Sequence, residues 1–231
     1  MSQAERLYLK VRKKIIEGGY QPGRRLREND LAVANGISRT PVREALSRLL
    51  AEGYVDRVGG RGHFVSELTV KGLKDTIEIR RIVEAAAATL AAERATPEQR
   101  RRLPELANFV PERRNRESYD QALNANRQFH LLIAHASQNA VLVDLVNYCL
   151  NQMSRYLALG LNLPDRYWRS IDDEHHHLAE AIVTGRSQEA RELMEQHLED
   201  SNRRIMDALV DAQAPPSDAA ASSFPAAVRA H

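Results

Sequence analysis

Three of the eight histidines lie on predicted helices at positions that point toward an apolar interior. Each shares a helical face with apolar residues three, four or seven positions away: Ile133 and Ala134 for His130, Leu178 and Ile182 for His175, and Leu193, Met194 and Ala190 for His197. Asn126, four residues before His130, faces the same way. Imidazole nitrogens bind Zn, Ni, Fe or Cu, and a side-chain oxygen completes a mixed site. The pattern predicts inward-facing groups; three separate core histidines remain the alternative, because periodicity does not show that they meet.

A second set of residues with the chemistry to bind a ligand lies near the N-terminus. It comprises two hydroxyls and three arginines: Ser38, Arg39, Thr40, Arg43 and, in a glycine-rich segment, Arg61. Arginine can donate two hydrogen bonds to guanine, and hydroxyl groups and helix-end N–H groups bind phosphates. A solvated surface charge is the alternative for one arginine. It is a poorer explanation for three arginines at two tips of one motif, so the set predicts contact with DNA.

The elements that would position this second set are short. Apolar residues recur at helical spacing in three segments, residues 4–17, 28–35 and 40–52. Thr40 is expected to cap the third helix, with Pro41 in its first position. Two β-prone runs flank the glycine-rich segment as a hairpin, residues 54–58 and 63–66. Three helices and a basic hairpin predict a winged helix-turn-helix over residues 1–69, whose third helix enters the major groove.

This N-terminal region resembles the DNA-binding domain of the GntR family of bacterial transcription regulators. The resemblance rests on three stretches, Leu26–Ala32, Gly36–Leu46 and Gly60–Gly62. It implies that Arg39, Thr40, Arg43 and Arg61 match positions that contact operator DNA.

The rest of the chain has a helical pattern up to about residue 213. Six helices are expected: Val70–Arg94, a shorter one among Pro97, Pro104 and Pro111, Glu117–Ser137, Ala140–Gly160, Arg166–Thr184 and Ser187–Ala212. The fold class is therefore mainly α, with the winged helix-turn-helix followed by an all-α bundle of six or seven helices over residues 70–213. Residues 214–231 are rich in Ala, Pro and Ser and are expected to be a disordered tail.

The helical region resembles the FCD effector domain of FadR-type GntR regulators. The resemblance is carried by Glu78–Arg80, Asn126–His130, Asn139, Glu174-His175 and His197-Leu198. It implies a divalent metal ion, Zn first with Ni, Fe or Mn as other candidates, held by Asn126, His130, His175 and His197.

Asn126 stands where many relatives carry Asp. Because its amide is neutral, the ligand set leaves the charge of the ion uncompensated, which favours an anionic effector such as a small organic acid. Arg80 and Arg155 are the candidates to bind that anion. For Arg80, an ion pair with Glu84 four residues later is the alternative.

Composition agrees with a two-part protein that binds DNA. Residues 1–69 carry 13 Lys and Arg against 8 Asp and Glu, a net charge of +5, and the remaining 20 against 23 give residues 70–231 a net charge of −3. A basic N-terminal part suits a polyanion. The single cysteine, Cys149, excludes an internal disulfide and a cysteine-only metal site. No apolar run approaches the ~18 residues of a membrane span, so no membrane partner and a cytoplasmic location are expected.

The predicted function is transcription regulation, as a repressor that binds a palindromic operator as a homodimer and responds to a small carboxylate metabolite. One alternative keeps the regulator without a metal, with an acyl or aromatic ligand in the bundle. A remote alternative is a metal-dependent hydrolase. The sequence has no His-Glu-x-x-His helix, and Glu174 is rotated by ~100° from His175, so no general base is expected beside the metal and no enzyme is predicted.

Overall fold

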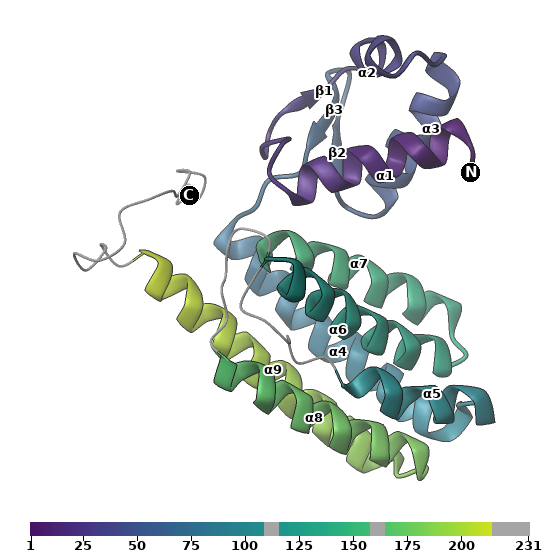
Figure 1. The fold of residues 1–231 in the computed structure, drawn as a ribbon, viewed down its shortest axis with the longest axis vertical. Helices are drawn as coiled ribbons and strands as arrows, with labels where there is room; N and C mark the ends of the chain where they lie inside the picture. Colours follow the sequence, from purple (N-terminus) through teal and green to yellow (C-terminus); the bar gives the residue numbers. More distant parts are fainter. Residues whose placement is uncertain (109–115, 158–164, 214–231) are drawn as a thin grey trace. The chain divides into compact units, whose positions relative to one another are not determined.

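The computed structural model describes residues 1–108, 116–157 and 165–213 (Figure 1). Contacts divide the chain into two compact units. Among the described residues, the first unit comprises 1–74 together with 151–157, and the second comprises 75–150 and 165–213. The predicted tail over residues 214–231 lies outside the described residues.

The first unit contains three helices and a three-stranded antiparallel sheet, as expected for a winged helix-turn-helix. Its elements are α1 (Gln3–Ile16), β1 (Arg25–Leu26), α2 (Glu28–Asn35), α3 (Arg39–Ala51), β2 (Val55–Val58) and β3 (Gly62–Val65). The strand order is β1-β3-β2. Strand β1 was not predicted, because two residues are too few to show an alternating pattern. Its Arg25 pairs with Phe64, so the hairpin is bound to the chain just before α2.

Helix α3 begins two residues earlier than predicted, at Arg39 and not at Pro41. Its N-cap is Ser38, which makes no side-chain capping bond, so the expectation that Thr40 caps the helix is wrong. Thr40 and Pro41 lie inside the first turn. The first N–H groups of a helix have no partner within the helix, so proline is tolerated there.

The connection from α2 to α3 depends on Gly36. This residue ends α2 in the left-handed conformation, with φ of 61°, which glycine adopts without a steric penalty. Side chains from all three helices and the sheet then share one core, whose fully buried members include Val42, Leu46, Leu49, Tyr54 and Val55. This core fixes α3 and the hairpin in one body.

The six helices predicted after residue 69 are confirmed to within a few residues, except that the end predicted at Gly160 lies outside the described residues. They are α4 (Val70–Arg94), α5 (Pro97–Ala107), α6 (Arg116–Ala136), α7 (Ala140–Leu157), α8 (Asp165–Val183) and α9 (Ser187–Gln213). Thr69 precedes α4 and accepts a hydrogen bond from the backbone N–H of Gly72 at 3.0 Å. Pro104 lies inside α5, which continues through it.

The core of the second unit is built from small side chains on α4 and larger ones on the helices around it. Four alanines of α4 are almost fully buried: Ala87, Ala88, Ala91 and Ala92. They pack with Phe129 and Ile133 of α6 and with Leu178 of α8 and Met194 of α9. Among the described residues, no helix is both long and apolar enough to cross a membrane. The packing brings α4, α6, α8 and α9 together, and these helices carry the inward histidines and their partners.

Candidate metal centre and nucleic-acid interface

The three histidines predicted to face inward do meet. His130 of α6, His175 of α8 and His197 of α9 are all buried, and one ring nitrogen from each lies within 4.8 Å of the others. Their ring centroids are 4.6 to 5.2 Å apart. No other group of three or more metal-binding side chains is found among the described residues.

The nitrogen atoms fit a divalent metal ion. Nε2 of His175 lies 3.2 Å from Nε2 of His197. Two nitrogen ligands at the usual Zn–N distance and tetrahedral angle would be about 3.3 Å apart. Nε2 of His130 is buried and has no hydrogen-bond partner in the described part of the chain. A buried nitrogen without a partner is costly, and an ion at the centre of the three rings would satisfy it.

Two carboxylates hold the opposite nitrogens of two of these rings. Oε2 of Glu84, on α4, lies 2.5 Å from Nδ1 of His130, and Oε1 of the same group lies 2.5 Å from Nε of Arg80. All three side chains are buried. Glu84 therefore connects a positive guanidinium to the far side of a candidate metal ligand.

The second carboxylate is on the other side of the cluster. Oε2 of Glu174 lies 2.8 Å from Nδ1 of His197, while Oε1 accepts hydrogen bonds from Ser170, at 2.8 Å, and from Arg204. A carboxylate behind a histidine is the usual support of a metal-binding imidazole. Apart from its place in the FCD resemblance, Glu174 was expected only to be turned away from His175; in the structure it reaches a histidine on the neighbouring helix.

The electrostatics favour ionised carboxylates at neutral pH and, for His175 and His197, neutral rings. Burial alone would raise the pKa of Glu84, but the charge of Arg80, electrostatic attraction to His130 and the hydrogen bonds from both residues lower it to about 2. Burial lowers the pKa of His197 to about 4, despite the opposing effect of Glu174, and lowers the pKa of His175 well below its usual value. Metal ligation requires neutral imidazole, so His175 and His197 are ready to bind without losing a proton.

Phe129 holds the third ring in place. Its ring stacks on that of His175, with centroids 4.2 Å apart and planes 19° from parallel. Phe129 is fully buried. This role could not be predicted from the sequence, because an aromatic residue at a helical core position carries no distinguishing signal.

The other predicted site residues of the helical region are not among the three clustered histidines. Asn126 lies one turn before His130 on α6 and is half-buried, so its role as an oxygen ligand stays a prediction. For Arg80, the alternative ion pair with Glu84 is confirmed. Arg155 belongs to the first unit, where it donates to the backbone carbonyls of Ser66 and Gly53. An effector role for Arg80 or Arg155 also stays a prediction.

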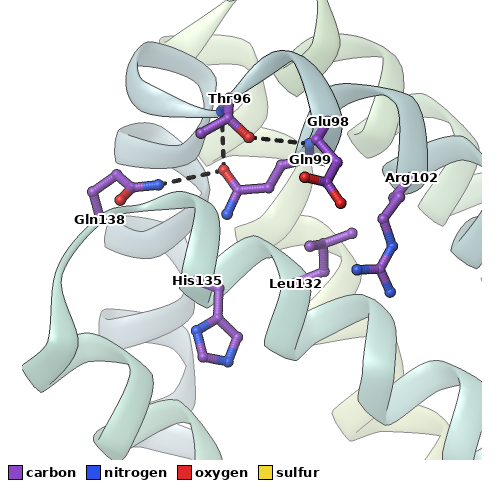
Figure 2. A pocket seen from close by; sticks show the side chains of 7 residues that line it. All are labelled: Thr96, Glu98, Gln99, Arg102, Leu132, His135 and Gln138. Carbon is purple, nitrogen blue, oxygen red and sulfur yellow. Dashed lines mark hydrogen bonds between the residues drawn. The ribbon is translucent and has the colours of Figure 1, made fainter.

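A surface pocket of about 520 Å³ lies elsewhere in the second unit (Figure 2). Seven residues of α5, α6 and the turns beside them line it: Thr96, Glu98, Gln99, Arg102, Leu132, His135 and Gln138. Thr96 and Gln99 are engaged in the capping box that begins α5, and Gln138 donates to Gln99. The charged groups in this pocket are exposed, unlike the buried histidines.

The predicted DNA-contacting residues are on the surface of the first unit. Four of them lie at the N-terminal end of α3, all exposed: Ser38, Arg39, Thr40 and Arg43. Arg61 is exposed at the turn between β2 and β3. Contact with DNA is a proposal for each of them, and their exposure leaves each able to reach it.

One acidic side chain holds two of these arginines. Oε2 of Glu28, at the start of α2, lies 2.9 Å from Nε of Arg43 and 3.7 Å from Nη2 of Arg39. Their side chains are 63% and 61% exposed, so water screens both contacts. The hydrogen bond from Arg43 is the main reason that the pKa of Glu28 is lowered. Glu28 therefore holds both arginine side chains in position, and the two contacts cost little free energy to break.

Known protein families match both parts of the chain. The family described as bacterial regulatory proteins, gntR family, matches residues 3–65, and the FCD domain family matches residues 75–200. The Nta operon transcriptional regulator of Aminobacter aminovorans is 28% identical over 190 residues, covering 81% of this chain and 87% of that protein.

Two further comparisons concern one Escherichia coli protein. The HTH-type transcriptional regulator McbR is 30% identical over 189 residues, covering 78% of this chain and 84% of that protein. A solved structure titled E. coli McbR/YncC superimposes with a TM-score of 0.72 and 25% sequence identity, covering 90% of this chain and 99% of that one. Relatives of this kind are transcription regulators, which supports the prediction that the chain is not an enzyme. The chain belongs to the GntR family of bacterial transcription regulators, with an N-terminal helix-turn-helix domain and a C-terminal FCD domain of the FadR-like subfamily.

Proposed function

We propose that this regulator is a repressor controlled by a small carboxylate anion that binds a divalent metal ion in the helical unit. The buried cluster of His130, His175 and His197 is the observation that supports the metal most strongly. Zinc suits three imidazole nitrogens best, and Ni, Fe and Mn are the other candidates. Asn126 would supply the oxygen ligand. When bound, the ion would supply positive charge and open coordination positions for an acid.

The charge balance of the cluster supports an anionic effector. Glu84 and Glu174 each carry a negative charge, but Arg80 and Arg204 each pair with one of them. The four charges cancel, and Asn126 is neutral. An ion of charge +2 would therefore remain uncompensated inside the protein, and a carboxylate would offset part of that charge.

The arginines around this cluster are also candidates to orient the acid. Arg80 uses its Nε toward Glu84. Arg204 is buried, donates through Nη2, and has an Nη1 without a hydrogen-bond partner among the described residues. A buried guanidinium nitrogen without a partner is a suitable donor to a carboxylate.

The DNA-binding half would act through a homodimer on a palindromic operator, because helix-turn-helix proteins read two half-sites through protein two-fold symmetry. Ser38, Arg39, Thr40 and Arg43 would contact the major groove or its phosphates, and Arg61 the backbone or minor groove. An effector changes this binding only if it binds one arrangement of the dimer better than the other.

Exposed apolar side chains of the second unit support self-association. They lie on two helices, Ile79 and Ile82 on α4 and Val141, Leu145 and Tyr148 on α7. Light scattering is expected to show a dimer for the wild type and a weaker dimer for Leu145→Glu, with Glu105→Gln as an exposed control.

Untagged protein is the material for the test of metal and effector. Metal analysis should find about one equivalent of zinc or a related ion in each chain. In thermal unfolding, an acid at ~100 times its Kd adds about 2.7 kcal/mol of stability. The stabilising acid should lose its effect when a chelator removes the metal, and it should change the affinity for operator DNA.

The outcome also decides between the two forms of the regulator. A stabilising ligand that is apolar, in protein that contains no metal, would support the alternative with an acyl or aromatic ligand. If acids, metals and chelator all leave operator binding unchanged, the proposed control by an effector is wrong.

A further inference from the structure

The two carboxylates behind the histidines differ from ordinary ion pairs in one respect: each accepts from an arginine through one oxygen and from an imidazole through the other. In Glu84 the two oxygens meet Arg80 and His130, both at 2.5 Å. In Glu174 they meet Arg204 and His197. Arginine has donors only, so the oxygen that faces it must accept.

This geometry decides which nitrogen of each ring carries the proton. An ionised carboxylate, in contrast, has hydrogen-bond acceptors only. Nδ1 of His130 and Nδ1 of His197 must therefore donate. In a neutral ring the proton is then absent from Nε2. The lone pairs of both Nε2 atoms are left for the centre of the cluster.

We propose that Glu84 and Glu174 are positioning residues that fix the tautomers of His130 and His197, and that Arg80 and Arg204 make a carboxylate necessary at both places. The proposal rests on the metal site proposed above, but the tautomers exist in metal-free protein and are measurable there. It assigns to the two arginines a role that is separate from any contact with an effector.

The arginines matter because of what an amide would do in place of each carboxylate. In Glu84→Gln, one side-chain end is an oxygen and the other an NH2 group. If the oxygen faces His130, the NH2 group faces the N–H of Arg80. Two hydrogen-bond donors then face each other, which is unfavourable. The oxygen therefore turns to Arg80, and the NH2 group donates to Nδ1 of His130. The proton of His130 then moves to Nε2 and blocks the metal position.

His175 is the ring whose tautomer must change when the ion binds. Its Nε2 lies 3.2 Å from Nε2 of His197. Since the proton of His197 is on Nδ1, His175 is the donor in this contact and carries its own proton on Nε2. Metal-free protein should thus contain two Nδ1-protonated rings and one Nε2-protonated ring in the cluster. Metal binding should move this proton from Nε2 to Nδ1 of His175, so that the ring stays neutral and Nε2 becomes available as a ligand.

The decisive experiment is long-range 1H–15N correlation NMR on full-length, chelator-treated protein with 15N-labelled histidine, near pH 7.5. Single His→Gln variants assign the three rings. In the wild type, His130 and His197 should show the Nδ1-protonated pattern. Glu84→Gln should convert His130 to the Nε2-protonated form, and Glu174→Gln should convert His197. Glu78→Gln, an exposed change on the same helix as Glu84, should leave all three patterns unchanged.

Two double variants separate tautomer control from simple loss of charge. In Arg80→Met with Glu84→Gln, the amide no longer faces a donor and can turn its oxygen to His130. The Nδ1-protonated pattern should then return, although the site still lacks the carboxylate. Arg204→Met with Glu174→Gln should behave in the same way for His197.

Zinc affinity, measured by competition with a chromophoric chelator, gives the second readout. Each single Glu→Gln variant should bind zinc about 10- to 100-fold more weakly than the wild type. Each double variant should recover part of that lost affinity. If Glu84→Gln does not fold, as judged by circular dichroism, Glu174→Gln decides the matter, because its side chain is 20% exposed.

The outcomes distinguish this inference from the proposed function. Unchanged tautomers in the single Glu→Gln variants would overturn the inference, even if zinc affinity falls, and the metal site would stand. Converted tautomers in a protein whose wild type binds no metal would support the role of the carboxylates, and the proposed metal-dependent function would fail.

Discussion

Both units of the protein contain an arginine–glutamate cluster, and the two clusters differ mainly in their access to water. On the surface of the first unit, Glu28 contacts Arg39 and Arg43, whose side chains are more than 60% exposed. In the bundle, Glu84 contacts Arg80 and His130, and its own side chain is 2% exposed. The same residue types therefore have different uses. The exposed pair can exchange glutamate for a phosphate or a base, whereas the buried pair holds a ring in one orientation.

The energetic difference follows from desolvation. An exposed ion pair contributes about 0–1 kcal/mol and is screened by salt. A buried pair gains little over apolar residues, but removal of one partner leaves an uncompensated charge in the core. The buried cluster is therefore sensitive to single changes, and the exposed cluster is not.

Removal of the buried carboxylate should have the largest effect. Glu84→Ala leaves Arg80 buried without its partner, and we expect a loss of about 3–5 kcal/mol in the free energy of unfolding. Chemical denaturation of metal-free protein measures it. Arg80→Met together with Glu84→Ala should recover much of the loss; equal destabilisation in the single and double variants would contradict this explanation.

Metal binding should give the next largest effect. Zinc at ~100 times its Kd should stabilise the wild type by about 2.7 kcal/mol. His175→Gln removes one ligand and should abolish this gain. His177→Gln, an exposed neighbour on the same helix, should keep it. Thermal unfolding with and without chelator is the measurement, and an equal zinc response in both variants would argue against the site.

Loss of an exposed arginine should matter for DNA and not for the fold. Arg43→Ala should weaken operator binding by ~1–3 kcal/mol and relax specificity if the contact is to a base. If the contact is to phosphate, binding should weaken equally on all sequences. Band shifts at fixed salt measure this, with Arg101→Ala in the second unit as an exposed control. Unchanged operator binding in Arg43→Ala and in Arg39→Ala would refute the assignment of α3 as the helix that contacts DNA.

Loss of the exposed glutamate should have a smaller effect on DNA affinity than loss of an exposed arginine, and it should raise the affinity where the arginine change lowers it. Glu28→Gln should change the free energy of unfolding by no more than about 1 kcal/mol. It should strengthen DNA binding slightly, because the two arginines no longer leave a carboxylate to meet the phosphates. Titration of operator and of random duplex DNA measures both affinities; a large loss of stability would show that the exposed cluster is structural.

Cys149 should show almost no reactivity. Burial, with a further contribution from Glu84, raises the pKa of its thiol to about 11, so the thiolate is a very small fraction at pH 8. Native protein should resist alkylation by iodoacetamide at this pH, and denatured protein should react at once. Mass spectrometry of the intact chain counts the adducts. Rapid labelling of the native protein would mean that the α7 core opens readily.

Much of the fold could be predicted because its signals are local. The helical period located α2, α3 and the bundle helices closely. Strand β1 could not be found, because its pairing with β3 depends on residues almost forty positions away. The start of α3 was misplaced because Thr40 and Pro41 suit either a cap or a first turn, and their sequence alone does not distinguish the two.

The candidate site was predicted in part for the same reason. Helical phase and resemblance identified His130, His175 and His197, since each faces the core of its own helix. Glu174 was set aside because its phase differs from that of His175, yet it supports His197 on another helix. Contacts between helices depend on their packing, which periodicity does not contain. Glu84 was considered only as the partner of Arg80, and its second oxygen reaches a histidine 46 residues later.

The last turns of α7 belong to the first compact unit. There Gln152 and Arg155 donate to the carbonyl of Gly53, Arg155 donates to that of Ser66, and Tyr54 donates to Asn151 at 3.2 Å. A cooperative folding unit is defined by such contacts and not by continuity of the chain. A DNA-binding fragment that ends near residue 74 would lack a piece that is encoded almost eighty residues later. Added back as a peptide, that piece should raise the melting temperature of the fragment, as in fragment complementation.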